Sequence, residues 1–191
     1  MAMASGKKKS DRKIPRKMTP ARLENIALHY LDRFSTSAEN LRRVLIRRAH
    51  KAAYHHDTDL EECGAWIDAL IARYQECDLL DDKAYAQAQA TSLNRRGKSV
   101  RAIGAMLYKK GVAAPIIDAV LGSLAEDHED PDLAAAVAHA RRRRLGPYRT
   151  RDVDDKGREK ELAAFARAGF SYGVAKRIVA ADTVEEIEDD R

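Results

Sequence analysis

The sequence repeats itself, and this repeat limits the folds open to the chain more than any other feature does. Residues 31–50 (LDRFSTSAENLRRVLIRRAH) superpose on residues 93–112 (LNRRGKSVRAIGAMLYKKGV) after a shift of 62 positions, apolar on apolar and basic on basic. The matched pairs are Leu31 with Leu93, Arg33 with Arg95, Ser37 with Ser99, Leu41 with Ile103, Val44 with Met106, Leu45 with Leu107, Arg47 with Lys109 and Arg48 with Lys110. Such self-similarity is typical of arrays in which each unit packs mainly against its neighbours.

A weaker third copy follows at a shift of 58 positions. The pairs are Gly111 with Gly169, Val112 with Phe170, Ile116 with Val174, Val120 with Ile178 and Leu121 with Val179. The match fails upstream, where Ile103 would fall on the acidic Glu161. We therefore expect a third unit that has diverged or slipped relative to the other two.

The repeated segments carry the periodicity and the end signals of α-helices. Apolar residues recur at helical spacing over 23–34, and Thr19-Pro20 offers a capping residue followed by proline at the first helical position. A capping box from Thr36 to Glu39 predicts the start of a second helix. Further helix starts are predicted at Asp59, Asp81, Ser99, Pro115 and Asp130, a left-handed helix end at Gly111, a loop over 145–153, and two last helices separated by Gly169.

We therefore expect an all-α protein, an elongated and curved array of three tandem three-helix repeats. Helix-favouring residues dominate, and no strand pattern competes with this interpretation. The expected parts are a disordered basic arm (1–18), repeat 1 (19–78, with an inserted loop at about 49–59), repeat 2 (79–128), repeat 3 (129–181) and an acidic tail (182–191).

Charge is distributed unevenly along the chain. The net charge is +5, yet the cations are concentrated in the N-terminal arm and in short runs, whereas 182–190 is mostly acidic. Local basic patches favour contact with a polyanion, although any single run can equally be solvated surface.

The two cysteines and the histidines favour structural roles. Cys63 and Cys77 fall on one apolar helical stripe, about 21 Å apart at 1.5 Å per residue, so we expect buried thiols that do not bond to each other. His50, His55 and His56 lie in or beside the expected insertion and lack the spacing of a zinc site. We expect no metal ion.

The chain shows no motif of nucleotide binding or nucleophilic catalysis. The acidic pairs Glu61-Glu62 and Asp81-Asp82 lie at predicted helix starts, where carboxylates complement the helix dipole. We expect neither catalytic residues nor a cofactor. No apolar run is long enough to span a bilayer and no secretory signal is evident, so we expect a cytoplasmic protein.

The basic residues are the candidates for binding a partner. They occur in clusters on the expected helices and at their ends: Arg42, Arg43, Arg47, Arg48, Arg95, Arg96, Lys98, Arg101, Lys109, Lys110, Arg141, Arg142, Arg143, Arg144, Arg149 and Arg151. Cations at a helix C-terminus also stabilise the helix dipole, which gives several of them a structural alternative. Trp66 and Tyr108 could stack on bases, but Trp66 lies near an apolar stripe, which favours core packing for it.

Three segments in the same order resemble the bacterial regulatory protein RecX family. They are LLDDKAYA (79–86), RGKSVRAIGAMLYKKGV (96–112) and AFARAGFSYGVAKRIV (164–179), and the resemblance covers roughly 20–181. Each motif is weak alone, whereas the ordered set is fairly specific. The sequence departs from the family at 49–59, which looks inserted, and at Ala168, where the family often has a basic residue.

The resemblance implies a modulator, most of all a negative regulator, of the RecA recombinase in DNA repair, recombination and the SOS response. Such proteins bind in the groove of the RecA nucleoprotein filament on single-stranded DNA and limit its extension, ATPase and coprotease activity. The expected partners are this filament and single-stranded DNA, with double-stranded DNA as a further candidate. We expect a monomer without a membrane partner. The alternative is a basic, helix-turn-helix-like DNA-binding or architectural protein that acts independently of RecA.

Overall fold

The computed structural model describes residues 15–127 and 130–188, which form ten α-helices and one turn of 3₁₀ helix without any strand. The helices are α1 (Pro20–Leu31), α2 (Ala38–Ala53), α3 (Leu60–Glu76), α4 (Asp82–Arg95), α5 (Val100–Lys109), α6 (Ala114–Asp127), α7 (Pro131–Arg143), α8 (Asp155–Arg167), α9 (Tyr172–Ala180) and α10 (Glu185–Glu188). The 3₁₀ turn η1 (Gly146–Tyr148) lies within the predicted loop 145–153. The prediction of an all-α protein is confirmed.

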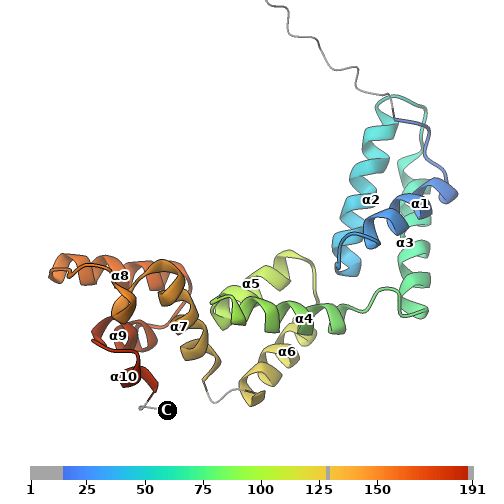
Figure 1. Cartoon of the computed structure of the whole chain (residues 1–191). Helices are drawn as coiled ribbons and strands as arrows, with labels where there is room; N and C mark the ends of the chain where they lie inside the picture. The colour runs from blue at the N-terminus through green and yellow to red at the C-terminus, as the bar shows by residue number, and fades with distance from the viewer. Residues whose placement is uncertain (1–14, 128–129, 189–191) are drawn as a thin grey trace, which may run out of the picture.

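The helices form an elongated, curved array (Figure 1). A first unit (α1–α3) stands at one end, a second unit (α4–α6) lies in the middle, and a third unit (α7–α9, followed by α10) forms the other end. In each unit the second helix lies on the inner side of the curve and the third helix on the outer side (Figure 1). We call α2, α5 and α8 the inner helices. The predicted curved array of three-helix repeats is confirmed.

Each unit has a hydrophobic core of its own. The largest fully buried side chains are Leu23, Leu41, Leu45 and Ile67 in the first core, Ile103, Leu107, Val120 and Leu124 in the second, and Leu133, Phe165, Ile178 and Ile187 in the third. Because no single core runs through the described part of the chain, the units are held in line by the joints between them.

Side-chain caps set the helix starts. Thr19 accepts the N–H of Arg22 at 3.2 Å before α1, and Asp59, Asp81 and Asp130 accept N–H groups at the starts of α3, α4 and α7, so these predicted starts are confirmed. The left-handed helix end at Gly111 is also confirmed, with φ of +81°.

Two predictions about α2 are wrong. Its N-cap is Ser37 rather than Thr36, because the Ser37 hydroxyl accepts the N–H of Asn40 at 3.2 Å, whereas Thr36 accepts from the Asn40 side chain. The predicted inserted loop at 49–59 is too long, because α2 continues to Ala53 and buries Ala49 and Ala52 in the first core. Residues 54–59 alone connect α2 to α3.

Both predicted tails are shorter than expected. Met18, placed in the arm 1–18, is 3% exposed within the first core, and the Pro15 carbonyl lies within hydrogen-bond distance of His56 Nε2. Within the acidic segment 182–191, α10 buries Ile187 in the third core. Residues 1–14 and 189–191 lie outside the described part of the chain, so the predictions for them stand untested.

The two cysteines have different environments. Cys63 is buried in the first core as predicted, and this burial raises the pKa of its thiol. Cys77 is exposed, contrary to the prediction, because α3 ends at Glu76 and Cys77 follows as its C-cap. Both are free thiols.

The third unit repeats the other two more faithfully than the sequence suggests. The shift of 58 that places Ile103 on Glu161 also places Leu107 on Phe165. Leu107 and Phe165 are both fully buried. Glu161 is itself buried and fills the core position of Ile103. The mismatch is therefore a different residue at an equivalent helix position, not a slip of the repeat.

The same joint connects the first unit to the second and the second to the third. At the first joint the hydroxyl of Ser37, the N-cap of α2, donates to the carbonyl of Lys110, the C-cap of α5. At the second joint the hydroxyl of Ser99, the N-cap of α5, donates at 2.9 Å to the carbonyl of Ala168, the C-cap of α8. The N-terminus of α2 is thus tied to the C-terminus of α5, and the N-terminus of α5 to the C-terminus of α8.

A carboxylate completes each joint. Asp82 in the first turn of α4 accepts the Ala38 N–H at 2.8 Å, and Asp132 in the first turn of α7 accepts the Val100 N–H at 2.7 Å. These are free N–H groups at the starts of the inner helices, so each helix end is satisfied by the neighbouring unit. Burial raises the pKa of Asp132, although the Val100 hydrogen bond opposes this shift.

The approach of α4 to α7 gives a test of the second joint. Gly97 has φ of +75°, and a Cβ there would lie 2.6 Å from the backbone nitrogen of His139 and 2.9 Å from the carbonyl oxygen of Ala135. Gly97→Ala should destabilise the protein by at least the roughly 1–2 kcal/mol cost of the left-handed conformation, because backbone atoms of α7 must also move. Urea denaturation followed by circular dichroism measures this loss.

The matched control is Gly122→Ala in α6. A Cβ at Gly122 meets no atom within 4 Å, so alanine should stabilise the helix by roughly 0.5–1 kcal/mol. Equal effects of the two substitutions would contradict a close joint at Gly97.

Candidate partner-binding surface

The inner helices carry exposed cations at equivalent positions. The shift of 62 places Arg47 of α2 on Lys109 of α5, and the shift of 58 places Lys109 on Arg167 of α8. All three side chains are exposed, and none forms a hydrogen bond or salt bridge with another described residue. Sequence reasoning missed Arg167 because the mismatch at Glu161 hid the equivalence of α5 and α8.

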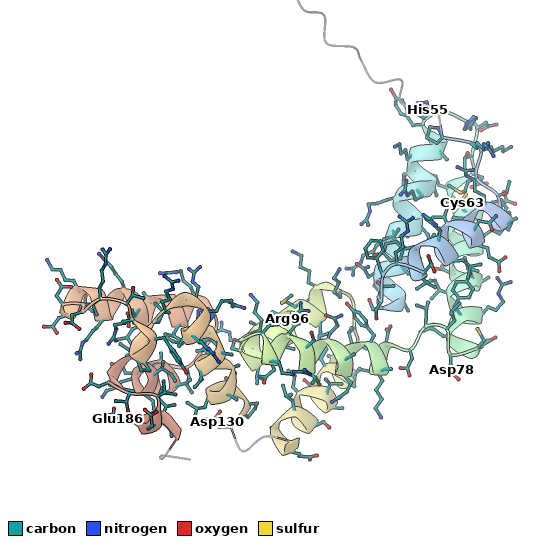
Figure 2. The ribbon with its side chains drawn as sticks, viewed as in Figure 1. His55, Cys63, Asp78, Arg96, Asp130 and Glu186 are labelled. Carbon is teal, nitrogen blue, oxygen red and sulfur yellow. The ribbon has the colours of Figure 1, made fainter. Side chains whose placement is uncertain are left out.

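Most of the other sequence candidates are also exposed and make no side-chain hydrogen bond or salt bridge within the described chain. These are Arg48, Arg95, Arg96, Lys98, Arg101, Lys110, Arg141, Arg143, Arg144 and Arg151. Arg96 lies where the second unit meets the third (Figure 2). Because these side chains are unpaired, they are available to a partner.

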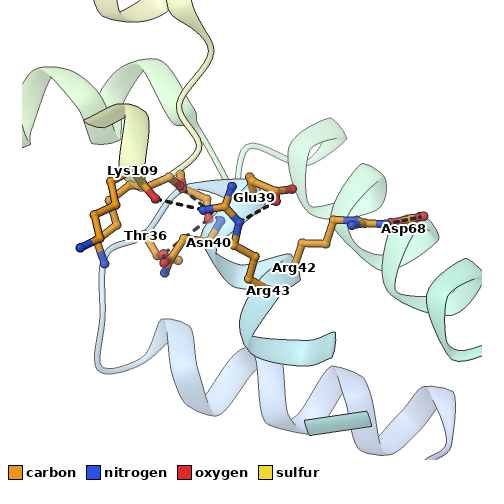
Figure 3. A network of polar contacts seen from close by, with 9 residues as sticks. Thr36, Glu39, Asn40, Arg42, Arg43, Asp68 and Lys109 are labelled. Atoms are coloured by element: carbon orange, nitrogen blue, oxygen red, sulfur yellow. Dashed lines mark hydrogen bonds and ion pairs between the residues drawn. The ribbon is translucent and has the colours of Figure 1, made fainter. Parts of the chain in front are cut away.

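Arg43 and Arg42 instead form bonds within the protein (Figure 3). The Arg43 guanidinium pairs with Glu39 at 2.8 Å and donates to the Lys109 carbonyl at 3.0 Å, so it strengthens the joint between the first two units. Arg42 forms a two-bond pair with Asp68 of α3, and this hydrogen bonding raises the pKa of Arg42 and lowers that of Asp68. Arg43 is the clearer case of a structural role.

Arg142 contributes to the second joint, where it donates to the Arg96 carbonyl. At the same joint the buried side-chain amide of Asn94 in α4 donates to the carbonyl of Pro131, the first residue of α7, at 2.9 Å. Between these elements, burial and the nearby Arg142 and Arg143 lower the pKa of His139. Part of the basic run 141–144 therefore serves the joint.

Arg149 lies inside the third unit. Its side chain is 15% exposed and pairs with Glu161 at 2.8 Å, and it also donates to the Val179 carbonyl at 2.7 Å. Glu161 in turn accepts the Gly146 N–H at 3.2 Å. Hydrogen bonding to Glu161 raises the pKa of Arg149, despite its burial. This pair places a charged group where the other units have Leu41 and Ile103.

The aromatic candidates differ in exposure. Tyr108 on α5 is 73% exposed, whereas Trp66 is half-buried against the first core, as its position on the apolar stripe predicts. In residues 15–127 and 130–188 no three His, Cys, Asp or Glu side chains gather in a way that could hold a metal ion. Among these residues no helix has the length and apolar character to cross a bilayer.

The fold and its exposed cations define a class of protein, a curved tandem array of three-helix units whose inner helices carry an exposed cation at equivalent positions. The family model described as RecX, second three-helix domain, matches residues 81–121, which run from the N-cap of α4 into α6. The chain is 41% identical over 174 residues to the regulatory protein RecX of Myxococcus xanthus, covering 91% of this chain and 92% of that protein. The chain belongs to the RecX family.

Two further similarities agree with this assignment. The regulatory protein RecX of Agrobacterium fabrum is 36% identical over 165 residues, which cover 86% of this chain and 85% of that protein. The crystal structure of RecX from Lactobacillus salivarius superposes with a TM-score of 0.60 over 84% of this chain and 94% of that chain, at 21% identity. At this identity the second similarity supports the fold.

The Arg149–Glu161 pair should be a structural element of the third unit. Glu161→Ile should cost about 3–5 kcal/mol of stability, because it leaves the Arg149 guanidinium without its carboxylate in a largely buried place. Arg149→Met combined with Glu161→Ile should recover most of this loss, because it restores the apolar core position of the other units. Thermal and urea denaturation of the single and double variants measure both values. A double variant less stable than the single one would contradict this role.

Proposed function

We propose that this protein modulates the RecA recombinase, and chiefly restrains it, by binding along the groove of the RecA filament on single-stranded DNA. Binding there limits the extension of the filament and its ATPase and coprotease activities. The protein acts by occupying a surface, without an active site of its own. The repeated exposed cation on the inner helices, at Arg47, Lys109 and Arg167, is the observation that carries this proposal.

Three features support the proposal. Membership of a family of regulatory proteins favours action on another protein. A filament presents the same surface at regular intervals, and a curved array of units with a repeated cation offers regular contacts in return. Exposed arginine and lysine side chains attract the phosphates of bound DNA or acidic groups of a protein and accelerate encounter.

A second candidate is a DNA-binding protein that acts without RecA. The observation in its favour is the number of exposed, unpaired cations at the ends of helices within three-helix units. Both candidates use the same residues, so a functional measurement must separate them.

The test measures ATP hydrolysis by RecA on single-stranded DNA with and without this protein. Wild type should reduce the rate, and Lys109→Ala combined with Arg167→Ala should lose most of this inhibition. Lys83→Ala combined with Lys176→Ala is the matched control, because it removes one exposed lysine from each of the same two units but from α4 and α9. This control should inhibit RecA as wild type does.

The salt dependence of DNA binding separates the two candidates. If both residues contact phosphates, their removal should flatten the log–log salt slope by about 1.4, at roughly 0.7 per contact with a single strand. Tight DNA binding by a wild-type protein that leaves RecA activity unchanged would favour the second candidate. Equal inhibition by the two double variants would show that Lys109 and Arg167 are solvated surface.

A further inference from the structure

The first unit contains a groove lined by cations and aromatic rings. It has a volume of about 800 Å³ and is formed by α1, α2 and the residues directly before and after α1. The basic side chains that line it are Arg16, Arg22, His29, Arg33, Arg48 and Lys51. Of these, Arg48 alone is among the candidates from the sequence, because the others come together only when α1 packs on α2.

The described lining of the groove is cationic and carries no carboxylate to balance this charge. Arg33, Arg48 and Lys51 are exposed without a hydrogen bond or salt bridge to another described residue. The Nε of Arg22 is buried and has no hydrogen-bond partner in the described part of the chain. Several unpaired cations around one hollow make it a site for an anion with more than one charge.

An aromatic pair lines the same groove. Phe34 is 54% exposed, and its ring lies against that of Tyr30 with 5.0 Å between the centroids. Tyr30 is held in place, because its hydroxyl accepts from the Asn40 side chain at 3.3 Å. Phe34 therefore offers a flat apolar surface, supported from one side, next to the cations.

Cations that track a phosphate backbone beside an aromatic stacking surface are the pattern that binds single-stranded nucleic acid. A base can stack on a side chain in this way only when it is unpaired and unstacked from its neighbours. The apolar surface distinguishes this site from a purely electrostatic patch, which would bind duplex and single strand through phosphates alone.

The groove is a property of the first unit and not of the repeat. The shift of 62 places Tyr30 on Ser92 and Lys51 on Ala113, so the second unit lacks both the supporting ring and one of the cations. Arg33 and Arg48 have basic counterparts in Arg95 and Lys110, so what sets the first unit apart is the aromatic pair together with Lys51.

We propose that this groove binds single-stranded nucleic acid directly, with one base stacked on Phe34 and the flanking phosphates on Arg33, Arg48 and Lys51. The stacked base gives the site a preference for unpaired strands. An acidic peptide is the other ligand that could satisfy the cations, but it gains nothing specific from the exposed ring.

The test uses the full-length protein without RecA, and measures fluorescence anisotropy of a short labelled oligothymidine and of an abasic strand of equal length. Phe34→Ala should weaken binding of the oligothymidine by roughly 5- to 150-fold, the range expected for one stacked base. It should leave binding of the abasic strand unchanged. Tyr172→Ala, which removes another exposed aromatic ring in the third unit, should affect neither strand.

The charges are tested in the same assay. Arg33→Ala and Lys51→Ala should each reduce the slope of log binding constant against log salt concentration by about 0.7 for both strands. The control variants Lys83→Ala and Lys176→Ala should leave this slope unchanged. Circular dichroism confirms that each variant is folded.

Two outcomes would overturn the proposal. Equal loss of the oligothymidine and the abasic strand on Phe34→Ala would mean that the ring stacks on no base. The second outcome combines two results: a polyglutamate peptide at equal charge concentration displaces the oligothymidine, and Phe34→Ala does not change binding of the oligothymidine. Together these results would assign the groove to an acidic peptide. Because RecA is absent, neither outcome depends on the function proposed above.

Discussion

The bond between the N-cap serine of one inner helix and the C-cap carbonyl of the next holds this molecule in its shape. Ser37 and Ser99 each have two tasks, since the same hydroxyl accepts an N–H of its own helix and donates to the following unit. This arrangement satisfies free groups at two helix ends at once. At α8 the N-cap is Asp154, whose side chain accepts the Gly157 N–H, so the third unit has no serine hydroxyl at this place.

The joints decide which surfaces the array presents. Because the same joint is used twice, the inner helices follow one another along one side of the curve, and residues at equivalent positions recur along it (Figure 1). Arg47, Lys109 and Arg167 occupy equivalent positions on α2, α5 and α8, although they lie far apart in the sequence. Some cations form hydrogen bonds across the joints, and Arg43 and Arg142 are the clearest examples. Some basic residues of this protein therefore hold neighbouring units together, whereas others are exposed and available to a partner.

Much of the fold could be predicted because its signals are local. Thr19, Asp59, Asp81 and Asp130 cap helices within three residues along the chain, and the apolar spacing identifies the buried faces. The failures are also informative. The sequence predicts an inserted loop at about 49–59, and the small side chains of Ala49 and Ala52 do not mark the apolar face of α2 there. Ile187 stands alone among acidic residues yet reaches the third core. Glu161 interrupts the repeat of apolar residues in the sequence, and its partner Arg149 lies in a separate loop.

The sequence by itself determined the class of fold, the helix starts and the repeated placement of apolar and basic residues, because these depend on interactions within one helix or one turn. Tertiary structure alone decided which cations are free. Arg43 and Arg47 stand one helical turn apart and look alike in the sequence, but Arg43 reaches a carbonyl of the next unit and Arg47 reaches solvent. The groove of the first unit likewise exists only where α1 packs on α2, since residues from 15–34 and 44–51 must meet to line it. Contacts between distant segments depend on how the units are joined, and no local pattern encodes that.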